Sequence, residues 1–543
     1  MKKWFVVGIL GAAQFVMVLD GTVMNVSIST VVEDLDTTVA AMQTAITFYT
    51  LTMAAFMLLG AKLGDVWGRR RTFVIGSIVY AIGSGSTALA PDFAVLFLGW
   101  SVVEGLGAVL VIPSIAALVA DNYQGKDRIT GFAVIGAVSG AAVAAGPLIG
   151  GFVTTYLSWR YVFAAEVVIM AAVVLTARFV TDSTPRQSIR IDLLSVLLSA
   201  AGLVFVVSGM LQSKAWGWVQ PLVSPEINGV PIQPLGISLT AWFIAVGAGL
   251  LYLFVRRQSA LVARGRPPLV HVSLFSIERL RSGLSVLGAQ YTITAGLFFM
   301  VPVYLQMTLG LDALETGIRI FPLSVSLVLF SIVGTRLSNL WSARRIVRVA
   351  QWVLVASSIV LLSAVEPKLE GPAFGLGMFF AGAALGLLAS QLGNVNMSAV
   401  SEKQTSEVGG LQGVSQNLGS SLGTALIGSV LIAALSASFT SGVTSSDLPQ
   451  DVQDQVVELS QGGIEIVPAA SVAQIASDAG LSDSDGEQLT AIYTDSQLSS
   501  LRTAFFALIA IALASLMLSR GIPSEVPARA LGRRTRRRRR SQK

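Results

Sequence analysis

The chain has 543 residues, of which 53% are hydrophobic and 13% are charged, and its mean hydropathy is +0.71. This composition excludes an ordinary soluble protein. The chain has no cysteine, which excludes disulfides and cysteine-ligated metals, and its single histidine, His271, argues against a metal site. The net charge of +6 is unevenly spread, so we attribute it to membrane topology rather than to nucleic-acid binding.

Apolar segments that are long enough to cross a bilayer as helices recur along the chain, and we count about fourteen. They lie at residues 4–30, 40–63, 72–90, 93–120, 129–154, 160–180, 192–213, 236–255, 280–308, 315–340, 345–364, 372–398, 406–437 and 499–519. The first segment begins like a signal peptide, but no small-residue cleavage site follows, so we expect a retained span. Lys and Arg concentrate in alternate loops, which predicts a multi-pass cell-membrane protein with both termini in the cytoplasm.

Two charged turns of similar pattern indicate an internal repeat. Gly60–Arg71 separates spans two and three, and Gly334–Arg345 separates spans ten and eleven. The spans then divide into six, two and six, which predicts an all-α membrane protein with two six-helix bundles and two inserted helices. The expected domains are 1–185 for the N-terminal bundle, 186–260 for the inserted helices with an outer loop, 261–520 for the C-terminal bundle, and 521–543 for a basic cytoplasmic tail.

Two segments outside the spans carry strong charge. The acidic insert at 438–498 has no Lys or Arg, and its parts 449–461 and 484–498 have helical periodicity. A small ordered cap outside the membrane and a disordered loop both remain open. The tail from Arg533 to Arg540 follows the last span, so we expect it to bind anionic lipid headgroups rather than nucleic acid.

The first charged turn reads Gly60-Ala-Lys-Leu-Gly-Asp-Val-Trp-Gly-Arg-Arg-Arg71. The arginines alone could be a positive-inside stop signal. The glycines let two helix ends approach, and Asp65 can accept hydrogen bonds from a neighbouring helix N-terminus. The pattern G-x-x-x-x-D-x-x-G-R-R-R resembles the signature loop of the major facilitator superfamily. The resemblance implies a role in conformational gating for Gly60, Asp65, Gly68, Arg69 and Arg70.

Asp20 lies deep in the first span, in Leu19-Asp-Gly-Thr-Val-Met-Asn-Val26. A carboxylate inside a membrane is costly and is therefore a functional candidate. The alternative is a structural hydrogen bond, for example to Thr22 or Asn25. The string resembles the signature L-D-x-T-x-x-N-V of the fourteen-span drug:proton antiporters, which implies that Asp20 and Asn25 contribute to substrate recognition or coupling.

Two further carboxylates lie in spans. Glu104 and Asp20 are each about 11 or 12 residues from the outer surface, so at a rise of ~1.5 Å per residue they lie at similar depth. The fourth span of the antiporters reads R-x-x-Q-G, whereas this chain has Ser101-Val-Val-Glu-Gly105. Glu104 is then either a substitute proton carrier or a sign of weak coupling. Glu166 follows Trp159-Arg-Tyr-Val-Phe163, which is close to the family's W-R-W-x-F.

The fifth span carries small residues and a proline, in Gly146-Pro-Leu-Ile-Gly-Gly151. Small residues permit close helix packing, and proline frees a carbonyl so that the helix can bend. The string resembles the second half of the antiporter signature G-x-x-x-G-P-x-x-G-G, which is associated with exporters. Gly146, Pro147, Gly150 and Gly151 are therefore expected to take part in gating.

Carboxylates among aromatic and amide side chains suit lipophilic or cationic amphiphiles. The residues expected to line the cavity are Phe15, Phe48, Tyr49, Phe298, Phe299, Tyr304, Gln306, Gln391, Asn394 and Gln416. The sequence predicts a monomeric, proton-coupled efflux transporter whose partners are a small amphiphilic substrate, protons and membrane lipids. It predicts no cofactor, metal, nucleic acid or enzyme activity. A lipid exporter with atypical coupling and a non-transporting membrane sensor or scaffold are the alternatives.

Overall fold

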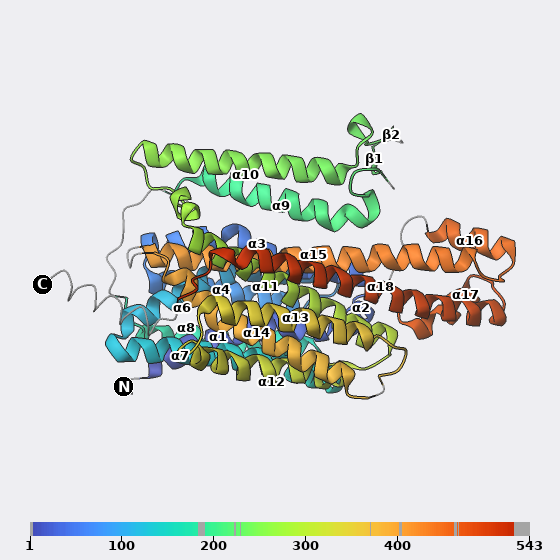
Figure 1. Ribbon diagram of the computed structural model, residues 1–543, viewed down its shortest axis with the longest axis horizontal. Coiled ribbons are helices and arrows are strands. Elements are labelled where there is room, and N and C mark those ends of the chain that lie inside the picture. The colour runs from blue at the N-terminus through green and yellow to red at the C-terminus, as the bar shows by residue number, and fades with distance from the viewer. Residues whose placement is uncertain are drawn as a thin grey trace, which may run out of the picture.

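The computed structural model describes residues 4–182, 191–221, 224–227, 230–369, 371–400, 404–460, 464 and 466–525. The predicted lipid-binding tail from Arg533 to Arg540 lies outside these residues. The described part is almost entirely helical, which confirms the all-α class (Figure 1). Its strands are one short antiparallel pair, β1 (Glu226–Ile227) and β2 (Val230–Pro231).

The first half of the chain forms one bundle of long helices. Its elements are α1 (Phe5–Val26), α2 (Ile28–Asp34), α3 (Val39–Trp67), α4 (Arg69–Ala88), α5 (Phe93–Leu96), the π-helix η1 (Phe97–Glu104), α6 (Gly105–Asn122), α7 (Gly125–Tyr156), α8 (Arg160–Thr176) and the short η2 (Ala177–Phe179). Polar side chains cap the helix starts where the sequence supplies them. Thr38 accepts from the Ala41 nitrogen at 3.1 Å, and Asp92 accepts from the Val95 nitrogen at 2.9 Å.

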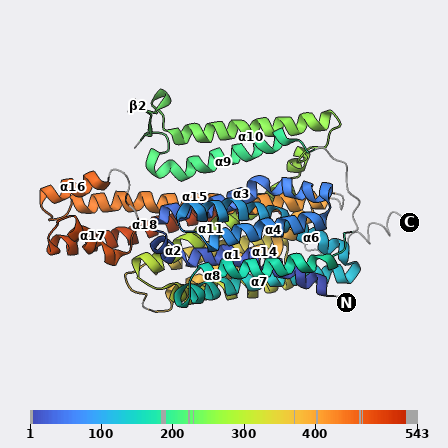
Figure 2. The same cartoon turned by 180° about the vertical axis from the view of Figure 1, so that it is seen from behind.

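The inserted helices α9 (Leu193–Trp216) and α10 (Leu239–Ala263) lie side by side along one flank of the bundle (Figures 1 and 2). Their backbones approach closely because glycines face each other: a methyl group on Gly247 would lie 2.7 Å from the carbonyl oxygen of Gly202. Helix α9 packs against α3 and α15, whereas α10 packs on α9 and contacts η4 near its end. The outer side of α10 is thus left for the membrane.

The second half of the chain forms the other long-helix bundle and a projecting cap. Its elements are η4 (Val272–Ser276), α11 (Glu278–Val303), the π-helix η5 (Tyr304–Thr308), α12 (Ala313–Leu337), α13 (Ala343–Ser363), α14 (Ala373–Met397), α15 (Thr405–Thr444), α16 (Gln450–Ser460), η7 (Ala469–Ser471), α17 (Val472–Asp478), α18 (Asp483–Leu518) and η8 (Ser519–Gly521); η3 (Pro234–Gly236) precedes α10.

The acidic insert is a helical cap in its described residues. Helices α15 and α18 extend beyond the bundle and carry α16 and α17 at the end opposite to the one where the chain starts (Figures 1 and 2). The helical periodicity predicted at 449–461 and 484–498 is confirmed by α16 and by the first part of α18. The Phe439 ring contacts Tyr493 at 5.5 Å, and the Tyr493 hydroxyl accepts from the Val467 nitrogen at 2.9 Å.

Thirteen helices in the described residues are long and apolar enough to cross a membrane, so the predicted number of fourteen is not reached by this measure. The predicted span that falls short corresponds to α4, because three arginines open it and glycine, serine and threonine fill much of its length. Helix α4 nevertheless packs between α6 and α8, and its Phe73 and Tyr80 are fully buried. Helix–helix contacts rather than its own hydropathy hold α4 in the bundle.

Candidate coupling site

Three acidic side chains from three helices meet inside the first bundle. Asp20 of α1, Glu104 at the end of η1 and Glu166 of α8 each place a carboxylate oxygen within 4.8 Å of the others. Their exposed fractions are 0%, 0% and 1%. No ion pair found among the described residues involves any of them. We call these three residues the acidic cluster.

The neighbours of the acidic cluster are neutral hydrogen-bond donors. The indole nitrogen of Trp100 donates to both carboxylate oxygens of Asp20, at 2.9 and 3.1 Å. The Ser84 hydroxyl lies 2.9 Å from Oε2 of Glu104 and 2.8 Å from Oε2 of Glu166. The second oxygens of Glu104 and Glu166 are buried and have no partner among the described residues. Two acceptor atoms are thus left open inside the bundle.

Close backbone packing positions these groups. A methyl group on Gly83 of α4 would lie 2.5 Å from the Glu104 nitrogen, and one on Gly107 would lie 2.5 Å from the Tyr80 nitrogen. The glycines therefore let α4 rest directly on η1 and α6, which brings Ser84 to Glu104. Trp100 and Glu104 lie in the eight-residue π-helix η1, and π-helical turns are frequent at functional sites.

The local hydrogen bonds proposed for Asp20 are absent from the described contacts. The Thr22 hydroxyl donates to the Leu19 carbonyl at 2.7 Å, and the Asn25 amide donates to the Gly21 carbonyl at 2.5 Å. Both side chains bond their own helix, and Trp100 supplies the donor to Asp20 instead. The role predicted for Asn25 in coupling stays a prediction. Ser101, at the position of the family's arginine, donates to the Ala45 carbonyl at 2.8 Å.

The side chains predicted to line a cavity lie in different surroundings. Tyr49 stacks on Trp100, with ring centroids 4.9 Å apart, and so adjoins the acidic cluster. Phe15 packs with Leu19 and Val162, and Phe48 meets Phe97 edge-on at 5.4 Å.

Gln306 links the bundles, because its amide nitrogen donates to the Val26 carbonyl at 2.8 Å and its oxygen accepts from the Ser29 hydroxyl at 2.6 Å. The other six lie in the second bundle, with Phe298 and Phe299 in its core. The Tyr304 hydroxyl donates to the Glu366 carbonyl at 2.7 Å, and the Gln391 amide donates to the Gly334 carbonyl at 3.0 Å. Asn394 is exposed and Gln416 is half-buried.

The first charged turn is held by aspartates other than the expected one. Gly68 has a φ of +97° and separates α3 from α4. Arg69 donates to Asp121 at 2.8 Å, and the Arg70 backbone nitrogen donates to Asp182 at 3.1 Å. The described contacts place Asp182 at the start of α4, while Asp65 lies in the last turns of α3, which continues through Trp67, so the role expected for Asp65 stays a prediction. Gly60 packs against the Val109 carbonyl of α6.

The small residues of α7 join the two bundles. Gly146 and Gly150 lie against Thr22 and Val23 of α1. On the α12 side, a methyl group on Gly151 would lie 2.5 Å from the Ala313 carbonyl, and Gly317 of α12 abuts the Pro147 carbonyl. A sliding movement of α7 would therefore involve both α1 and α12.

The sequence reasoning missed several residues of the site and of the bundle interface. Trp100 and Ser84 contact the acidic cluster. The sequence could have indicated Trp100, because it lies four residues before Glu104, which is about one helical turn. Gln43 of α3 is fully buried and donates to the carbonyls of Thr424 and Ala425 in α15, at 3.0 and 3.2 Å. This contact lies in the second interface between the bundles, where α3 packs against α15.

The acidic cluster is the one place in the described residues where three acid groups come within reach of a single small cation. Oxygen donors of this kind suit a proton or a hard cation. The absence of a metal and of a cofactor, as predicted from the sequence, stays a prediction.

Comparison with known proteins identifies the family. Residues 10–424 match the sequence model of the Major Facilitator Superfamily. The puromycin resistance protein of Streptomyces alboniger is 31% identical over 370 residues, which are 67% of this chain and 69% of that protein. The probable actinorhodin transporter of Streptomyces coelicolor is 25% identical over 429 residues, 77% of this chain and 70% of that protein.

Solved structures agree on the fold. A bacterial homologue of the human lysosomal transporter Spinster, in an inward-facing and unoccupied conformation, aligns with a TM-score of 0.60 at 15% identity, over 96% of this chain and 97% of that one. At this identity the likeness concerns the fold alone. The chain belongs to the major facilitator superfamily of membrane transporters.

Proposed function

We propose that the protein is a proton-coupled exporter of lipophilic or cationic amphiphilic molecules that works by alternating access. The observation that carries the proposal is the acidic cluster, which is buried in a membrane bundle without a basic partner among the described residues. The relatives named for puromycin resistance and actinorhodin transport support a small-molecule cargo that leaves the cell. The proposed setting is the cell membrane, with a monomer whose termini are cytoplasmic.

Electrostatics supports protons as the coupling ion. Three ionised carboxylates this close together in a low-dielectric interior would repel one another and would each lose hydration. The Ser84 hydroxyl has one proton, so it can donate to only one of the two glutamates that contact it. The other short contact is favourable when that glutamate carries a proton and donates to Ser84. The geometry therefore suits a cluster that holds at least one exchangeable proton.

Exchange follows from the same geometry. When the bundles open toward one side, water and cargo reach the cluster, and a cationic cargo can replace the proton as the neutralising charge. The ring of Tyr49, stacked on Trp100, offers an aromatic face beside Asp20 for the apolar part of such a cargo. The α7–α12 and α3–α15 seams would separate in turn as the bundles rock. No cofactor is involved.

Transport in proteoliposomes tests the proposal. A fluorescent cationic dye is followed with and without an imposed pH gradient, for the wild type and for Asp20→Asn, Glu104→Gln and Glu166→Gln. Because each change replaces one ionisable carboxylate with a neutral amide, we expect the gradient-driven rate of dye transport to fall to the rate measured without a gradient. Dye exchange at equal pH on both sides should persist in at least the glutamate variants, since it needs no net proton movement.

Asp451→Asn is the matched control, because Asp451 is exposed on α16 in the cap. Unchanged gradient-driven transport in all three cluster variants would overturn the proton assignment. A fluorescent phospholipid in place of the dye tests the lipid alternative. If the phospholipid moves in the wild type and the dye does not, the proposed cargo class is wrong.

A further inference from the structure

A cleft of about 380 Å³ opens where the end of α3, the end of α10 and the segment before η4 meet. It lies apart from the acidic cluster. Its lining combines cationic and apolar groups: Lys62, Val262, Gly265, Arg266, Pro267, Pro268 and His271. We call this the basic cleft.

The loop that carries Arg266 is fixed at its start by the end of α10. Gly265 has a φ of +65°, and its nitrogen donates to the Val262 carbonyl at 3.0 Å, while the Arg266 nitrogen donates to the Leu261 carbonyl at 2.9 Å. This pair of hydrogen bonds around a left-handed glycine is the Schellman ending of a helix. The two prolines that follow restrict the loop further.

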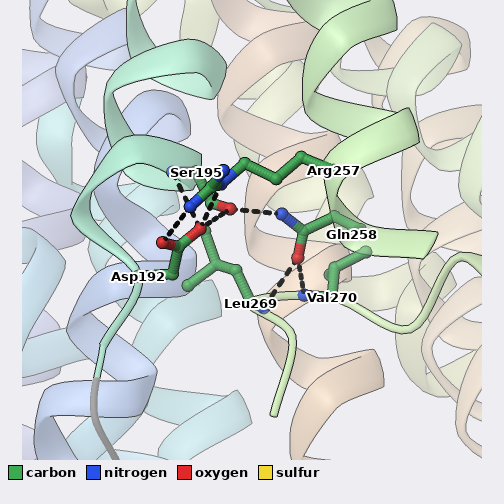
Figure 3. Close-up of polar contacts among 6 residues, drawn as sticks. All are labelled: Asp192, Ser195, Arg257, Gln258, Leu269 and Val270. Atoms are coloured by element: carbon green, nitrogen blue, oxygen red, sulfur yellow. Dashed lines mark hydrogen bonds and ion pairs between the residues drawn. The ribbon is translucent and has the colours of Figure 1, made fainter. Parts of the chain in front are cut away.

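A polar network fixes the other end of the loop (Figure 3). Gln258 of α10 is fully buried, and its oxygen accepts from the nitrogens of Leu269 and Val270 at 2.7 and 3.3 Å. Its amide nitrogen donates to the Ser195 hydroxyl at 2.7 Å, and Ser195 in turn bonds Asp192. Asp192 accepts two hydrogen bonds from Arg257, at 2.6 and 2.7 Å. Hydrogen bonds within the protein therefore hold the wall of the cleft in place without a ligand.

The charges that face the cleft leave it positive. Among the described residues, neither the Lys62 ammonium nor the Arg266 guanidinium makes an ion pair or a side-chain hydrogen bond. His271 faces Glu407, whose carboxylate lies 2.9 Å from Nδ1 of His271 and also accepts from the His271 backbone nitrogen at 2.5 Å. The nearby Arg257 is neutralised by Asp192. Lys62 and Arg266 thus contribute two cations without an ion-pair partner among the described residues, one from each side of the cleft.

We propose that the basic cleft binds the phosphate of an anionic phospholipid. Phosphate is an anion that Lys and Arg recognise well. The lipid source follows from the position of the cleft beside α10, whose Leu253, Val255 and Val262 are 52%, 43% and 47% exposed. In a membrane helix such side chains face acyl chains, so the headgroup of the same lipid reaches the cleft.

The bound lipid would connect the two halves of the transporter. Lys62 belongs to α3 of the first bundle, whereas Arg266 and His271 lie in the segment that leads into α11 of the second. A phosphate between them adds an attraction across the seam at the end of the bundle that carries the charged turns. The lipid therefore favours the conformation in which this end is closed.

Lipid binding is measured by native mass spectrometry of the full chain in nanodiscs of one part phosphatidylglycerol to two parts phosphatidylcholine. For Lys62→Gln and Arg266→Gln we expect about fivefold weaker binding of phosphatidylglycerol each, and about 30-fold weaker binding for the pair. Arg264→Gln is the matched control, since Arg264 is exposed at the end of α10 but does not line the cleft. The basic tail is present in every variant and cancels from the comparison.

Equal weakening by Arg264→Gln and by the cleft variants would overturn the proposal, since it would show a diffuse surface effect. So would displacement of phosphatidylglycerol by millimolar glycerol phosphate, which would show a site for a free phosphate. If the double variant does not fold, Lys62→Gln alone gives the same test, and Lys62→Arg should retain binding. The assay does not involve transport, so its failure is independent of the proposed proton coupling.

Discussion

The interiors of the two bundles differ in chemistry although both are built from long packed helices. The first encloses Asp20, Glu104 and Glu166, whereas no buried acidic or basic side chain is found among the described residues of the second. Its buried polar groups are amides and hydroxyls. Gln351 donates to the Ser515 hydroxyl at 2.8 Å, and Gln290 donates to the Leu385 carbonyl at 3.3 Å.

The difference indicates a division of labour. An amide side chain that forms a hydrogen bond to a neighbouring helix is buried at a modest cost in free energy and holds the helices together. A buried carboxylate without a counter-ion is much more costly, so a cluster of three requires a function to explain it. We infer that the first bundle handles the coupling ion and that the second serves as the surface against which it moves.

The two charged turns also differ in the groups that their arginines contact. In the first, Arg69 pairs with Asp121, and a carboxylate of Asp182 meets the start of α4. In the second, Arg345 lies over the Trp341 ring at 4.3 Å, and Arg344 donates to backbone carbonyls near the end of α18, including that of Ile522 at 2.6 Å. The repeat conserves arginines at this end of both bundles and replaces the acidic partners with aromatic and backbone ones.

The largest effect should come from the packing behind the acidic cluster. Gly83→Ala places a methyl group 2.5 Å from the Glu104 nitrogen, so α4 must move away from η1. We expect the free energy of unfolding to fall by about 1–3 kcal/mol, as for other overpacked interiors. Unfolding in mixed detergent micelles measures this change, and gradient-driven dye transport should fall with it.

Gly375→Ala in the second bundle is the matched control, because no atom lies within 4 Å of the added methyl group. It should leave stability unchanged or raise it by up to about 1 kcal/mol, since alanine favours a helix over glycine. Equal destabilisation by both alanines would mean that the contact between α4 and η1 is not special to the first bundle.

A smaller effect is expected from the neutral interior. Gln351→Leu removes the donor to Ser515 and also removes a buried amide oxygen that has no partner among the described residues. We expect a loss of about 1 kcal/mol or less in the free energy of unfolding. The ratio of dye transport with and without a pH gradient should equal that of the wild type. A ratio that falls to that of Glu104→Gln would refute the division of labour.

The sequence predicted those parts of the site that depend on position along one helix. Helix rise places Asp20 and Glu104 at similar depth, the sequence also named Glu166 as a third carboxylate in a span, and the structure brings the three together. The donors were not predictable, because Ser84 and Trp100 meet the carboxylates only through the close packing that Gly83 and Gly107 allow. Asp65 was assigned a capping role from its place near a turn. The carboxylate seen to accept from the Arg70 nitrogen is that of Asp182, which is far away in sequence and reaches Arg70 through the tertiary fold.

The hydropathy of whole segments was a better guide than any single residue, with α4 as the exception. Its arginines, glycines and serines make it a poor membrane span by composition. The same small residues let it pack tightly between α6 and α8. Features that weaken a sequence signal can therefore be those that position a site.

The smallest effect concerns Asp192, the half-buried acid at the start of the inserted pair of helices, in contrast to the fully buried acidic cluster. Two hydrogen bonds from Arg257 and two from Ser195, given by its hydroxyl and its backbone nitrogen, lower the pKa of Asp192 from 3.8 to about 2. The lowered pKa means that the ion pair contributes stability above about pH 4, and this contribution is lost as the pH falls through about 2.

Asp192→Asn should therefore lower the free energy of opening of the loop between α10 and η4 at pH 7 by about 1 kcal/mol or less, as for a partly exposed pair. Amide hydrogen exchange at Leu269 and Val270 measures this, because both amides bond to Gln258 in the same network. Asp451→Asn should leave that exchange unchanged, whereas equal protection in Asp192→Asn and wild type at pH 7 would show that Gln258 holds the loop without the ion pair.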